Sequence, residues 1–365
     1  MNILHVIAEM GRGGAERIVL DLVGAGCTAG GRVAVASGGG AWVPSIEQRG
    51  GSHHHVGLAV PTGSATLRSA LKLSSVIRRF RPDVIHTHNV RATIATRAAM
   101  HLARGSIPMI TTFHGGVESE NYSKAVRLLQ RTTPLVVACA PAIGRSLVEA
   151  GYPKERLEVI RNGASLDPAS AVRVQRMVDQ HGLGSAPVVG LGRLVPQKGW
   201  RHLIGAATQL CDLDVEFVVA GEGPLRGELE ALVVRSGAPV RFIGAVDDVA
   251  ALLGAARAVV SSSLWEGLPI SLMEAVSLGL PAVATTVDGV MDVFDDRTAV
   301  LVPPGDEHSL AAGLRRVLTD PAHADAISAR GQAAAPQWSP LEMTRGYELQ
   351  YSAATRRSES RRLIA

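Results

Sequence analysis

The sequence predicts an α/β protein built from two doubly wound, parallel-sheet domains that face each other across a cleft. Length and composition give the first indication: of the 365 residues, 46% are hydrophobic. Such a chain can form the cores of two domains of the usual size, about 100–200 residues each. The second indication is a rhythm, because short β-branched runs alternate with helix-like stretches along both halves, as in parallel sheets with crossover helices.

The first half contains five predicted strands, each followed by a helical stretch or a turn. They are NILHVIA, RVAVAS, PDVIHTH, PMITTFHG and PLVVACA. The three histidines from His53 to His55 have the composition of a metal site but no partner cluster elsewhere, so we expect a loop there. We assign residues 1–165 to the N-terminal domain.

The second half repeats the pattern with six predicted strands. They are APVVGLG, VEFVVAG, PVRFIG, RAVVSSS, PAVATT and TAVLVPP. The joint between domains is expected near residues 161–170, where Asn-Gly and Asp-Pro interrupt both periodicities. The second domain is therefore assigned to residues 166–335. Residues 336–365 read as a helix that we expect to cross back to the first domain, followed by a polar tail, RRSESRR, that we expect to be disordered.

Composition argues against several classes of protein. No uncharged apolar run approaches the roughly 18–20 residues that span a bilayer, and the first residues lack a signal peptide, so we expect a cytoplasmic protein. The cysteines Cys27, Cys139 and Cys211 are odd in number and have no CxxC spacing. We therefore expect buried thiols rather than disulfides or a zinc site. Aromatic residues make up 4% of the chain and do not interleave with the arginines, which argues against a nucleic-acid partner.

Positive charge is concentrated in one segment, although the formal net charge is only +4. Eight basic residues and a single acid, Asp83, lie between Arg68 and Arg104. Helical spacing separates an apolar face from a basic face that carries Arg68, Lys72 and Arg79. The apolar face comprises Ala70, Leu73, Val76, Ile77 and Phe80. Two interpretations stay open for the basic face: simple solvation, or contact with anionic lipids at the inner face of the cell membrane.

A glycine-rich turn, GRGGAER, occupies residues 11–17 between the first strand and the first helix. Glycines allow a ligand to approach the backbone, and the free N–H groups of a helix start attract phosphate or another anion. The turn differs from a dinucleotide fingerprint, because Glu16 occupies the third glycine position and no acid lies between Asp21 and Glu47. We therefore do not expect an NAD site. A plain tight turn is the alternative.

The stretch GLGRLVPQKG follows the first strand of the second domain. Arg193 supplies a planar guanidinium and Lys198 a compact ammonium, a pairing that suits the spread charge of a diphosphate. The chain has only four lysines, which makes Lys198 noticeable. A solvated pair of loop charges is the alternative.

The stretch EGLPISLME contains two carboxylates eight residues apart, Glu266 and Glu274. Pro269 suits a first helical turn and Gly279 a helix end, so Glu266 is expected in a loop and Glu274 on a helix. Eight residues of helix rise about 12 Å, more than the roughly 5–9.5 Å between the carboxylates of glycosidases. The pair fits a ligand with hydroxyls at both ends and phosphates between them, as in a nucleotide sugar.

Three histidines stand at predicted strand ends: His114 in TTFHGG, and His86 and His88 in VIHTHN. A histidine at such a position is more often a hydrogen-bonded structural residue than a catalytic one. Three acidic pairs could be mistaken for metal sites, but without a converging third ligand we expect turn and cap roles for them. These pairs are Asp212 and Asp214, Asp247 and Asp248, and Asp295 and Asp296. No metal site is predicted.

The ordered motifs of the chain resemble those of retaining glycosyltransferases of family four, which have the GT-B fold of two Rossmann-like domains. The motifs are GGAER, TTFHG, VIRNG, GRLVPQKG, VAGEGP and EGLPISLMEA. The resemblance extends from Met1 to about Ala354. One departure is VIRNG, which has arginine where family members often have proline, so the hinge is expected to differ slightly.

The resemblance implies roles for individual residues. The first glutamate of the family's E-x7-E element binds the donor sugar and the second the ribose, which implies Glu266 and Glu274. The diphosphate would contact Arg193 and Lys198, and the family's active-site histidine corresponds to His114. The family uses no bound metal or other cofactor. The remaining donor-binding positions implied are Gly13, Gly14, Gly267, Leu268, Pro269 and Ile270.

The expected activity is transfer of a sugar, with retention, from a nucleoside diphosphate sugar to an acceptor hydroxyl. A UDP-sugar is favoured over a GDP-sugar. The first domain would bind a saccharide, glycolipid or small-molecule acceptor in cell-envelope or extracellular polysaccharide synthesis. A natural-product glycosyltransferase, a nucleotide-sugar epimerase, a non-catalytic nucleotide-sugar-binding protein and a dehydrogenase are the alternatives.

Overall fold

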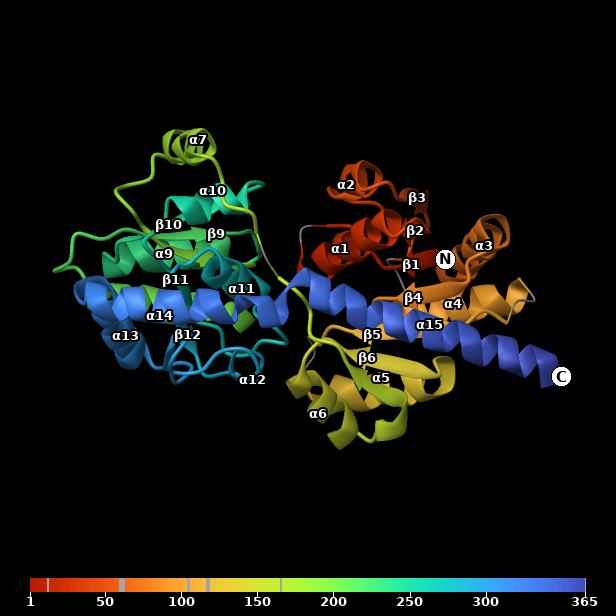
Figure 1. Ribbon diagram of the computed structural model, residues 1–365. Coiled ribbons are helices and arrows are strands. Elements are labelled where there is room, and N and C mark those ends of the chain that lie inside the picture. Colours follow the sequence, from red (N-terminus) through yellow and green to blue (C-terminus); the bar gives the residue numbers. More distant parts are fainter. Residues whose placement is uncertain (12, 59–62, 104–105, 116–118, 165, 365) are drawn as a thin grey trace. The chain divides into compact units, whose positions relative to one another are not determined.

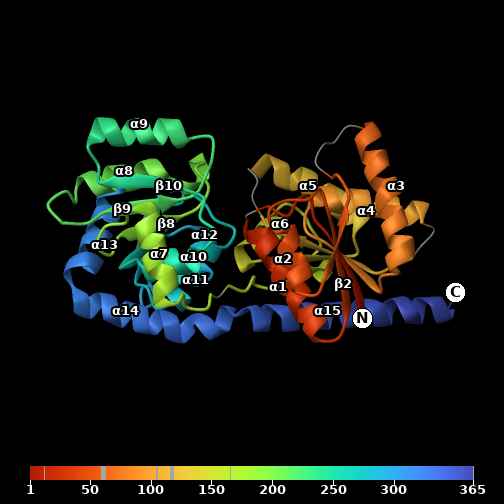
Figure 2. The same cartoon turned by 90° about the horizontal axis from the view of Figure 1, so that it is seen from above.

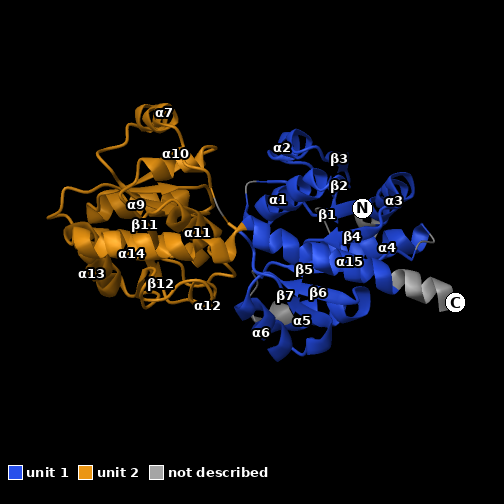
Figure 3. Cartoon of the chain, in the orientation of Figure 1, with its two compact units in different colours: residues 1–163, 340–365 blue, residues 164–339 orange. Residues whose placement is uncertain are grey.

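The computed structural model describes residues 1–364 apart from residues 12, 59–62, 104–105, 116–118 and 165. It divides into two compact units (Figure 3). Unit 1 comprises Met1–Gly163 and Pro340–Ala365, and unit 2 comprises Ala164–Ser339. The chain thus passes between the units twice, at 163–164 and at 339–340.

Unit 1 contains a seven-stranded sheet in the order β3-β2-β1-β4-β5-β6-β7. Figure 1 labels the strands from β3 to β6. Every neighbouring pair of its strands is parallel. Helix α1 packs against α2 and α15, whereas α3 packs against α4 and α4 against α5, so that two groups of helices cover the two faces. The elements are β1 (Asn2–Val6), α1 (Gly14–Thr28), β2 (Arg32–Ser37), α2 (Val43–Gln48), β3 (Ser52–His55), α3 (Gly63–Phe80), β4 (Val84–Thr87), α4 (Val90–Leu102), β5 (Met109–Phe113), α5 (Ser119–Thr132), β6 (Leu135–Ala138), α6 (Pro141–Glu149), η1 (Lys154–Arg156), β7 (Leu157–Val159) and α15 (Pro340–Ile364).

Unit 2 contains a six-stranded parallel sheet in the order β10-β9-β8-β11-β12-β13. Two hydrophobic clusters, one around Phe217 and Leu203 and one around Val218 and Met273, fill the two faces of this sheet. The elements are α7 (Ala171–His181), β8 (Val188–Leu191), η2 (Pro196–Lys198), α8 (Trp200–Thr208), β9 (Phe217–Ala220), α9 (Arg226–Ser236), β10 (Val240–Gly244), α10 (Val249–Gly254), β11 (Ala258–Ser261), α11 (Ile270–Ser277), β12 (Ala282–Thr285), α12 (Asp288–Met291), β13 (Val300–Val302), α13 (Glu307–Thr319), α14 (Pro321–Ala334) and η3 (Ala335–Trp338).

Each sheet has one topological switch point, where the strand order reverses direction. In unit 1 the switch lies between β1 and β4, and in unit 2 between β8 and β11. Open α/β sheets bind ligands outside the carboxyl ends of the strands at such points. The loops after these four strands are therefore where a site is expected.

The parallel α/β class and all eleven predicted strands are confirmed, but two edge strands were missed. The prediction of a loop at His53–His55 is wrong, because these residues form β3 and pair with Val35, Ala36 and Ser37 of β2. Backbone hydrogen bonding to β2 does not require apolar side chains at an edge, where both faces of the strand are partly solvated. The second missed strand is β7, of only three residues.

The predicted apolar face of α3 is confirmed. Ala70, Leu73, Ile77 and Phe80 are buried, and Val76 is half-buried. Arg68, Lys72 and Arg79 are exposed on the same helix. No helix in the described part of the chain is long and apolar enough to cross a bilayer.

Two smaller expectations are wrong. The polar residues at the C-terminus do not form a disordered tail but continue α15 as far as Ile364. Extending an existing helix needs no new nucleation, and arginine and glutamate are good helix formers. Cys211 is an exposed thiol rather than a buried one, whereas Cys139 is buried and Cys27 is half-buried.

Helix α15 is the long C-terminal helix that Figure 2 draws in blue. A buried polar network attaches it to the unit 1 sheet. The Tyr351 hydroxyl lies 2.7 Å from His86 Nδ1, and the Tyr347 hydroxyl lies 2.8 Å from Thr112 Oγ1. Thr112 Oγ1 in turn lies 2.7 Å from His86 Nε2. Because all four side chains are buried, each of these hydrogen bonds satisfies groups that water does not reach.

We predict that Tyr351→Phe lowers the free energy of unfolding by about 1–3 kcal/mol, since His86 Nδ1 loses its partner within the core. Urea denaturation measures the effect. Tyr152→Phe is a matched control, because Tyr152 is equally buried and its hydroxyl has no hydrogen-bond partner among the described residues. It should be neutral or slightly stabilising. Equal effects of the two substitutions would contradict the network.

Candidate functional site

In unit 2 the predicted residues Arg193, Lys198 and Glu266 all lie in the connections at the switch point of the sheet, with Lys198 at the end of the short 3-10 helix η2. Arg193 and Lys198 follow β8, and Glu266 follows β11. These two strands are neighbours, so their carboxyl ends lie side by side. The sheet topology therefore brings together groups that are 68 residues apart in sequence.

The loop after β8 is held in place by its backbone. Gly192 N–H donates to the Ala220 carbonyl and Leu194 N–H to the Glu222 carbonyl, which ties this loop to the glycine-rich loop after β9. The Trp200 indole N–H donates to the Arg193 carbonyl at 2.9 Å. A Cβ at Gly221 would overlap the Gly192 carbonyl, so only glycine permits this approach. The loop after β9 thus serves as a scaffold, as expected from VAGEGP.

The loops after β8 and β11 are joined by hydrogen bonds. Leu264 N–H donates to the Gln197 carbonyl, and the Ser262 hydroxyl donates to the Lys198 carbonyl at 3.0 Å. Gly199 has a φ of 61° and lies against Ser262, whose carbonyl a Cβ at this position would overlap. Glycine is required there both for its backbone conformation and for the close approach.

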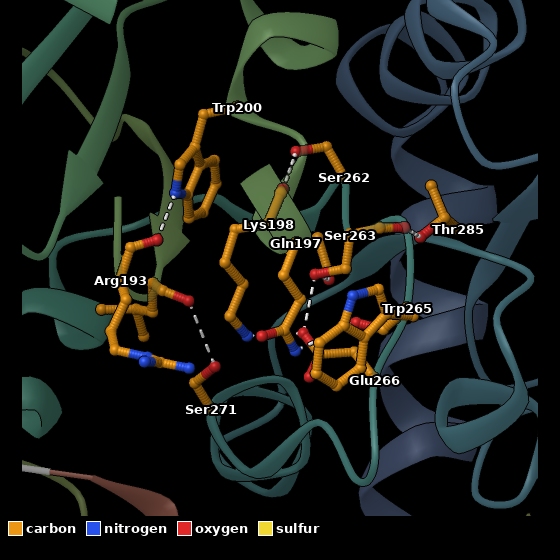
Figure 4. A network of polar contacts seen from close by, with 12 residues as sticks. Arg193, Gln197, Lys198, Trp200, Ser262, Ser263, Trp265, Glu266, Ser271 and Thr285 are labelled. Carbon is orange, nitrogen blue, oxygen red and sulfur yellow. Dashed lines mark hydrogen bonds and ion pairs between the residues drawn. The ribbon is translucent and has the colours of Figure 1, made fainter. Parts of the chain in front are cut away.

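Lys198 and Glu266 form an ion pair at the centre of these loops (Figure 4). Lys198 Nζ lies 2.5 Å from Glu266 Oε1, and the exposed fractions of the two side chains are 17% and 6%. The Ser263 hydroxyl donates to the same carboxylate oxygen at 2.7 Å. A charge-assisted hydrogen bond in a largely dry position fixes both side chains in orientation. The two predicted ligand-binding groups are therefore each other's partners in this structure.

The stretch from Gly267 to Glu274 has the predicted form. Pro269 precedes α11 directly, and Glu274 lies within the helix and is buried. Helix α11 ends at Ser277 and is capped by Leu278. Gly279 follows with a φ of 85°, and Leu280 N–H donates to the Ala275 carbonyl, as in a Schellman motif. Leu268 and Ile270 pack against the core. A Cβ at Gly289 would lie 2.6 Å from the Gly267 carbonyl, so the turn before α11 is closely packed.

In unit 1 the glycine-rich turn leads into α1. Gly13 caps the helix with extended backbone and Gly14 is its first residue; Arg12 lies outside the described residues. The carboxylate of Glu16 folds back over Gly13, so that a side chain at position 13 would require the Glu16 carboxylate to move. The partial positive charge of the helix start thus already faces one anionic group.

His114 follows the carboxyl end of β5 and is half-buried. Its Nε2 lies 3.4 Å from His88 Nδ1. Burial lowers the pKa of His114 to about 4, so the ring is neutral near pH 7. In this state it can offer one N–H donor and one acceptor, but no positive charge.

Three buried histidines behind His114 could be mistaken for a metal centre. His5, His86 and His88 each place one ring nitrogen within 4.8 Å of the others. However, both His86 nitrogens are bonded to hydroxyl groups, and His5 Nδ1 lies only 3.0 Å from His88 Nε2. Direct contact at this distance is a hydrogen bond. Two nitrogens bound at about 2.0–2.1 Å to a tetrahedral zinc would lie farther apart. We interpret the group as a hydrogen-bonded network.

The acidic pairs have one member each in a structural role. Asp248 caps α10 and pairs with Arg173, and Asp295 bonds the backbone of Arg297 in a turn. Asp212 forms a bidentate pair with Arg315. Arginine neighbours hold the pKa of each of these three carboxyl groups below its usual range.

A large cavity elsewhere in unit 1 does not coincide with these residues. It has a volume of about 1600 Å³ and is lined by Leu67, Arg97 and His101 among others. Its lining includes Met109 and Leu135, the first residues of β5 and β6. It therefore lies at the edge of the sheet opposite to His114.

Sequence reasoning missed three residues that support the predicted ones. Ser263 bonds Glu266, Gln197 donates to the Trp265 carbonyl at 3.1 Å, and His5 bonds His88. The run of serines at a strand end was a usable signal for Ser263. The contact of His5 with His88 depends on the register of β1 and β4, in which His5 lies opposite His86, and this register was not known from the sequence.

Two family models match the chain. The model of Glycosyltransferase Family 4 matches residues 12–168, and the model of Glycosyl transferases group 1 matches residues 186–320. The first segment lies in unit 1 except for its last five residues, and the second lies in unit 2. Together they include all the predicted site residues.

Several curated proteins are similar in sequence. Glycogen synthase of Mycobacterium tuberculosis is 30% identical over 286 residues, which cover 72% of this chain and 67% of that protein. The lipopolysaccharide core biosynthesis glycosyltransferase LpsD of Rhizobium meliloti is 29% identical, with 91% and 92% covered. The 2-deoxystreptamine glucosyltransferase of Streptomyces kanamyceticus is 34% identical, but the match spans only 48% of either chain.

Solved structures share the architecture. HepE of Anabaena, crystallised with UDP and glucose, superposes with a TM-score of 0.86 at 24% identity, covering 97% of this chain and all of that one. WaaG, involved in lipopolysaccharide biosynthesis, gives a TM-score of 0.73 at 15% identity, with 94% and 98% covered. Two Rossmann-like units with loops of this kind at the carboxyl edges define the GT-B class of protein. Within this class, the chain belongs to the family-four, or group 1, glycosyltransferases.

We predict that Lys198→Met lowers the free energy of unfolding by about 2–3 kcal/mol, because Glu266 is left charged with little access to water. The effect should be smaller than the roughly 3–5 kcal/mol of a fully buried pair, since Lys198 is partly exposed. Guanidinium denaturation measures it. The double variant Lys198→Met/Glu266→Gln should recover part of the loss.

The matched control is Arg315→Met, which breaks the exposed pair with Asp212. Its unfolding midpoint should stay close to that of the wild type. If Lys198→Met also leaves the midpoint unchanged, the ion pair does not contribute to holding the two loops together.

Proposed function

We propose that the protein transfers a sugar from a nucleoside diphosphate sugar to an acceptor hydroxyl, with retention at the anomeric carbon. The observation that carries this proposal is the Lys198–Glu266 pair at the switch point of unit 2, with Arg193 in the same loop. A cation and a carboxylate side by side at the carboxyl edge of the sheet suit a donor with both phosphates and hydroxyls, because the cation can bind phosphate and the carboxylate can accept from hydroxyls.

Donor binding would exchange the partners of this pair. The diphosphate would take Lys198 and Arg193, and Glu266 would then accept hydrogen bonds from hydroxyls of the sugar. Glu274, which is buried within α11, would bind the ribose. The pair thus holds both groups near their ligand positions beforehand, which reduces the entropy lost on binding.

Catalysis on this proposal is mainly electrostatic. Arg193 and Lys198 would stabilise the charge that develops on the departing diphosphate, a kind of interaction that is worth several kcal/mol of barrier. No side chain of the protein is assigned as nucleophile. The leaving phosphate would take the acceptor proton, and neutral His114 would position the sugar. We propose no resident metal ion or cofactor.

The relatives support a choice of donor and a biological role. UDP and glucose are bound in the HepE structure, which supports a UDP-sugar as the donor of this chain. LpsD matches over nearly its whole length, which supports an acceptor in cell-envelope saccharide or glycolipid synthesis. The 2-deoxystreptamine glucosyltransferase keeps a small-molecule acceptor as the second candidate.

Three other functions are separated by simple assays. An epimerase would convert the donor into its epimer without any acceptor. A non-catalytic binding protein would bind the donor and turn over none of the acceptors. A dehydrogenase would bind NADH, for which the turn at Gly13 and Gly14 lacks the third glycine and the ribose-binding acid.

We predict that a UDP-sugar raises the melting temperature more than the matching GDP- or ADP-sugar, because a ligand stabilises the state to which it binds. With a panel of saccharide and lipid-linked acceptors, the product should have the anomeric configuration of the donor by NMR. Arg193→Ala and Lys198→Ala should each lower kcat roughly 100-fold, as does loss of one donor to a developing oxyanion.

The control is Arg201→Ala, a change of the same charge at an exposed position on α8. It should retain wild-type kcat and donor affinity. An inverted product would refute the retaining mechanism. Unchanged donor affinity and turnover in a variant with alanine at Arg193, Lys198, Glu266 and Glu274 would refute the site.

We also propose that α3 contacts an anionic membrane surface. Leu67 and Leu71 are exposed to 56% and 51%, and the basic Arg68 and Lys72 beside them are exposed as well. Apolar side chains combined with basic ones on a helix surface favour the interface of an anionic bilayer. Such a contact would bring the enzyme to a lipid-linked acceptor.

We expect the protein to float with vesicles that contain phosphatidylglycerol at low salt, and to be released at high salt. Lys72→Glu should weaken binding about fivefold or more, given about 1 kcal/mol for each basic residue near the surface. Arg235→Glu, on exposed α9 of unit 2, changes the net charge equally and should not affect flotation. Vesicle binding that is unchanged both by high salt and by Lys72→Glu would argue against the contact.

A further inference from the structure

Three imidazole rings of unit 1 form a continuous chain that ends at the predicted active-site histidine. His114 Nε2 lies 3.4 Å from His88 Nδ1, and His88 Nε2 lies 3.0 Å from His5 Nδ1. Both nitrogens of His88 are therefore used. The two outer nitrogens, His114 Nδ1 and His5 Nε2, have no hydrogen-bond partner among the residues that the structure describes.

The ring geometry supports hydrogen bonding along the chain. The rings of His88 and His114 are within 18° of parallel, with centroids 5.7 Å apart. Because the facing nitrogens are closer than the centroids, the rings meet edge to edge. His86 lies beside His88, with centroids 4.0 Å apart, but its nitrogens are bonded to Tyr351 and Thr112. It is therefore outside the chain.

All three rings are neutral near pH 7. Burial lowers the pKa of His5 to about 3 and that of His114 to about 4, and it holds the pKa of His88 well below its usual value. A neutral imidazole carries one N–H and one lone pair. Since each contact needs one donor and one acceptor, the tautomers of the three rings are coupled.

Only two arrangements satisfy both contacts. In the first, His5 donates to His88 and His88 donates to His114, which leaves a lone pair on His5 Nε2 and an N–H on His114 Nδ1. In the second, His114 donates to His88 and His88 donates to His5, which leaves an N–H on His5 Nε2 and a lone pair on His114 Nδ1. The choice depends on which end better tolerates an N–H without a partner.

The two ends have different environments. His5 is fully buried in the middle of β1, with 0% exposure, where neither water nor a ligand can supply an acceptor. Buried N–H groups without partners are rarer and costlier than buried lone pairs. His114 Nδ1 is itself buried in this structure, but His114 as a whole is half-buried and follows the carboxyl end of β5, at the edge where ligands of parallel sheets bind. A small rotation of the His114 ring would therefore bring its Nδ1–H to water or to a ligand, whereas no such movement could provide an acceptor for His5 Nε2. The first arrangement is therefore favoured.

We propose that His88, closed off at its far side by His5, is a positioning residue that fixes His114 as the Nδ1–H tautomer. His114 then presents a hydrogen-bond donor, not a base, to an oxygen of the bound ligand. In that last respect the inference rests on the proposed function, because the ligand oxygen would belong to the donor sugar or its phosphate. The tautomer itself is a property of the protein without ligand.

The test is NMR of the ligand-free protein labelled with ¹⁵N-histidine. The ring nitrogen shifts and their couplings to ring protons distinguish the two tautomers, and a His114→Asn spectrum assigns the His114 signals. We expect His114 to carry its proton on Nδ1. A wild-type protein with the proton of His114 on Nε2 would overturn the proposal without any variant being needed.

Two variants separate positioning from a structural role. His88→Leu removes the donor to His114, so His114 should shift to the Nε2–H form or to a mixture. His5→Leu removes an equally buried ring but keeps the far end closed and apolar, so His88 should keep its proton on Nδ1 and His114 should stay Nδ1–H. A merely structural role would make the two variants alike, and an unchanged His114 tautomer in His88→Leu would refute the proposal.

Tyr351→Phe controls for general disturbance of the cluster, because it removes the partner of His86 and leaves the chain intact. It should lower stability without changing the His114 tautomer. In the transfer assay, His88→Leu should reduce kcat/KM about threefold to tenfold, the contribution of one ordinary hydrogen bond. If the tautomers behave as expected but no donor sugar is transferred, the proposed function fails and the positioning role of His88 stands.

Discussion

The polarity of the parallel sheet is the constraint on which the rest of this structure depends. In each unit all strands point the same way, so every carboxyl end lies at one edge, and the reversal of strand order leaves this edge open beside the central strands. Arg193, Lys198 and Glu266 in unit 2, and His88 and His114 in unit 1, follow strands at such edges. A buried core then supports loops whose side chains are available for chemistry.

Within unit 2, the open edge is stabilised by the groups that we assign to ligand binding. Lys198 and Glu266 bond each other, and the serine hydroxyls and glycines of the two loops fix the backbone around them. A charged group at a nearly dry position is costly without a partner. While no ligand is present, each charge of the pair is stabilised by the other. The pair also holds both charges close to where a sugar diphosphate would bind.

Elements with a strong local signal were predicted correctly from the sequence, whereas elements that depend on a neighbouring strand or helix were not. Strands such as those at Val188–Leu191 and Phe217–Ala220 are buried on both faces and form continuous apolar runs, so they were recognised. The edge strand at Ser52–His55 is polar and exists because β2 offers it a free edge. The C-terminal residues are polar as well, yet they extend a helix already started at Pro340. In both cases a neighbouring element decided what local composition could not.

The sequence by itself determined the α/β class, the strand and helix order, and the positions of the charged loop residues, because periodicity, glycine and proline act over short distances. The tertiary structure alone decided the partners. Lys198 meets Glu266 because β8 and β11 are neighbours across the switch point, and His5 reaches His88 because β1 and β4 pair in register. Contacts between residues far apart in sequence depend on strand order and register, which no local pattern encodes.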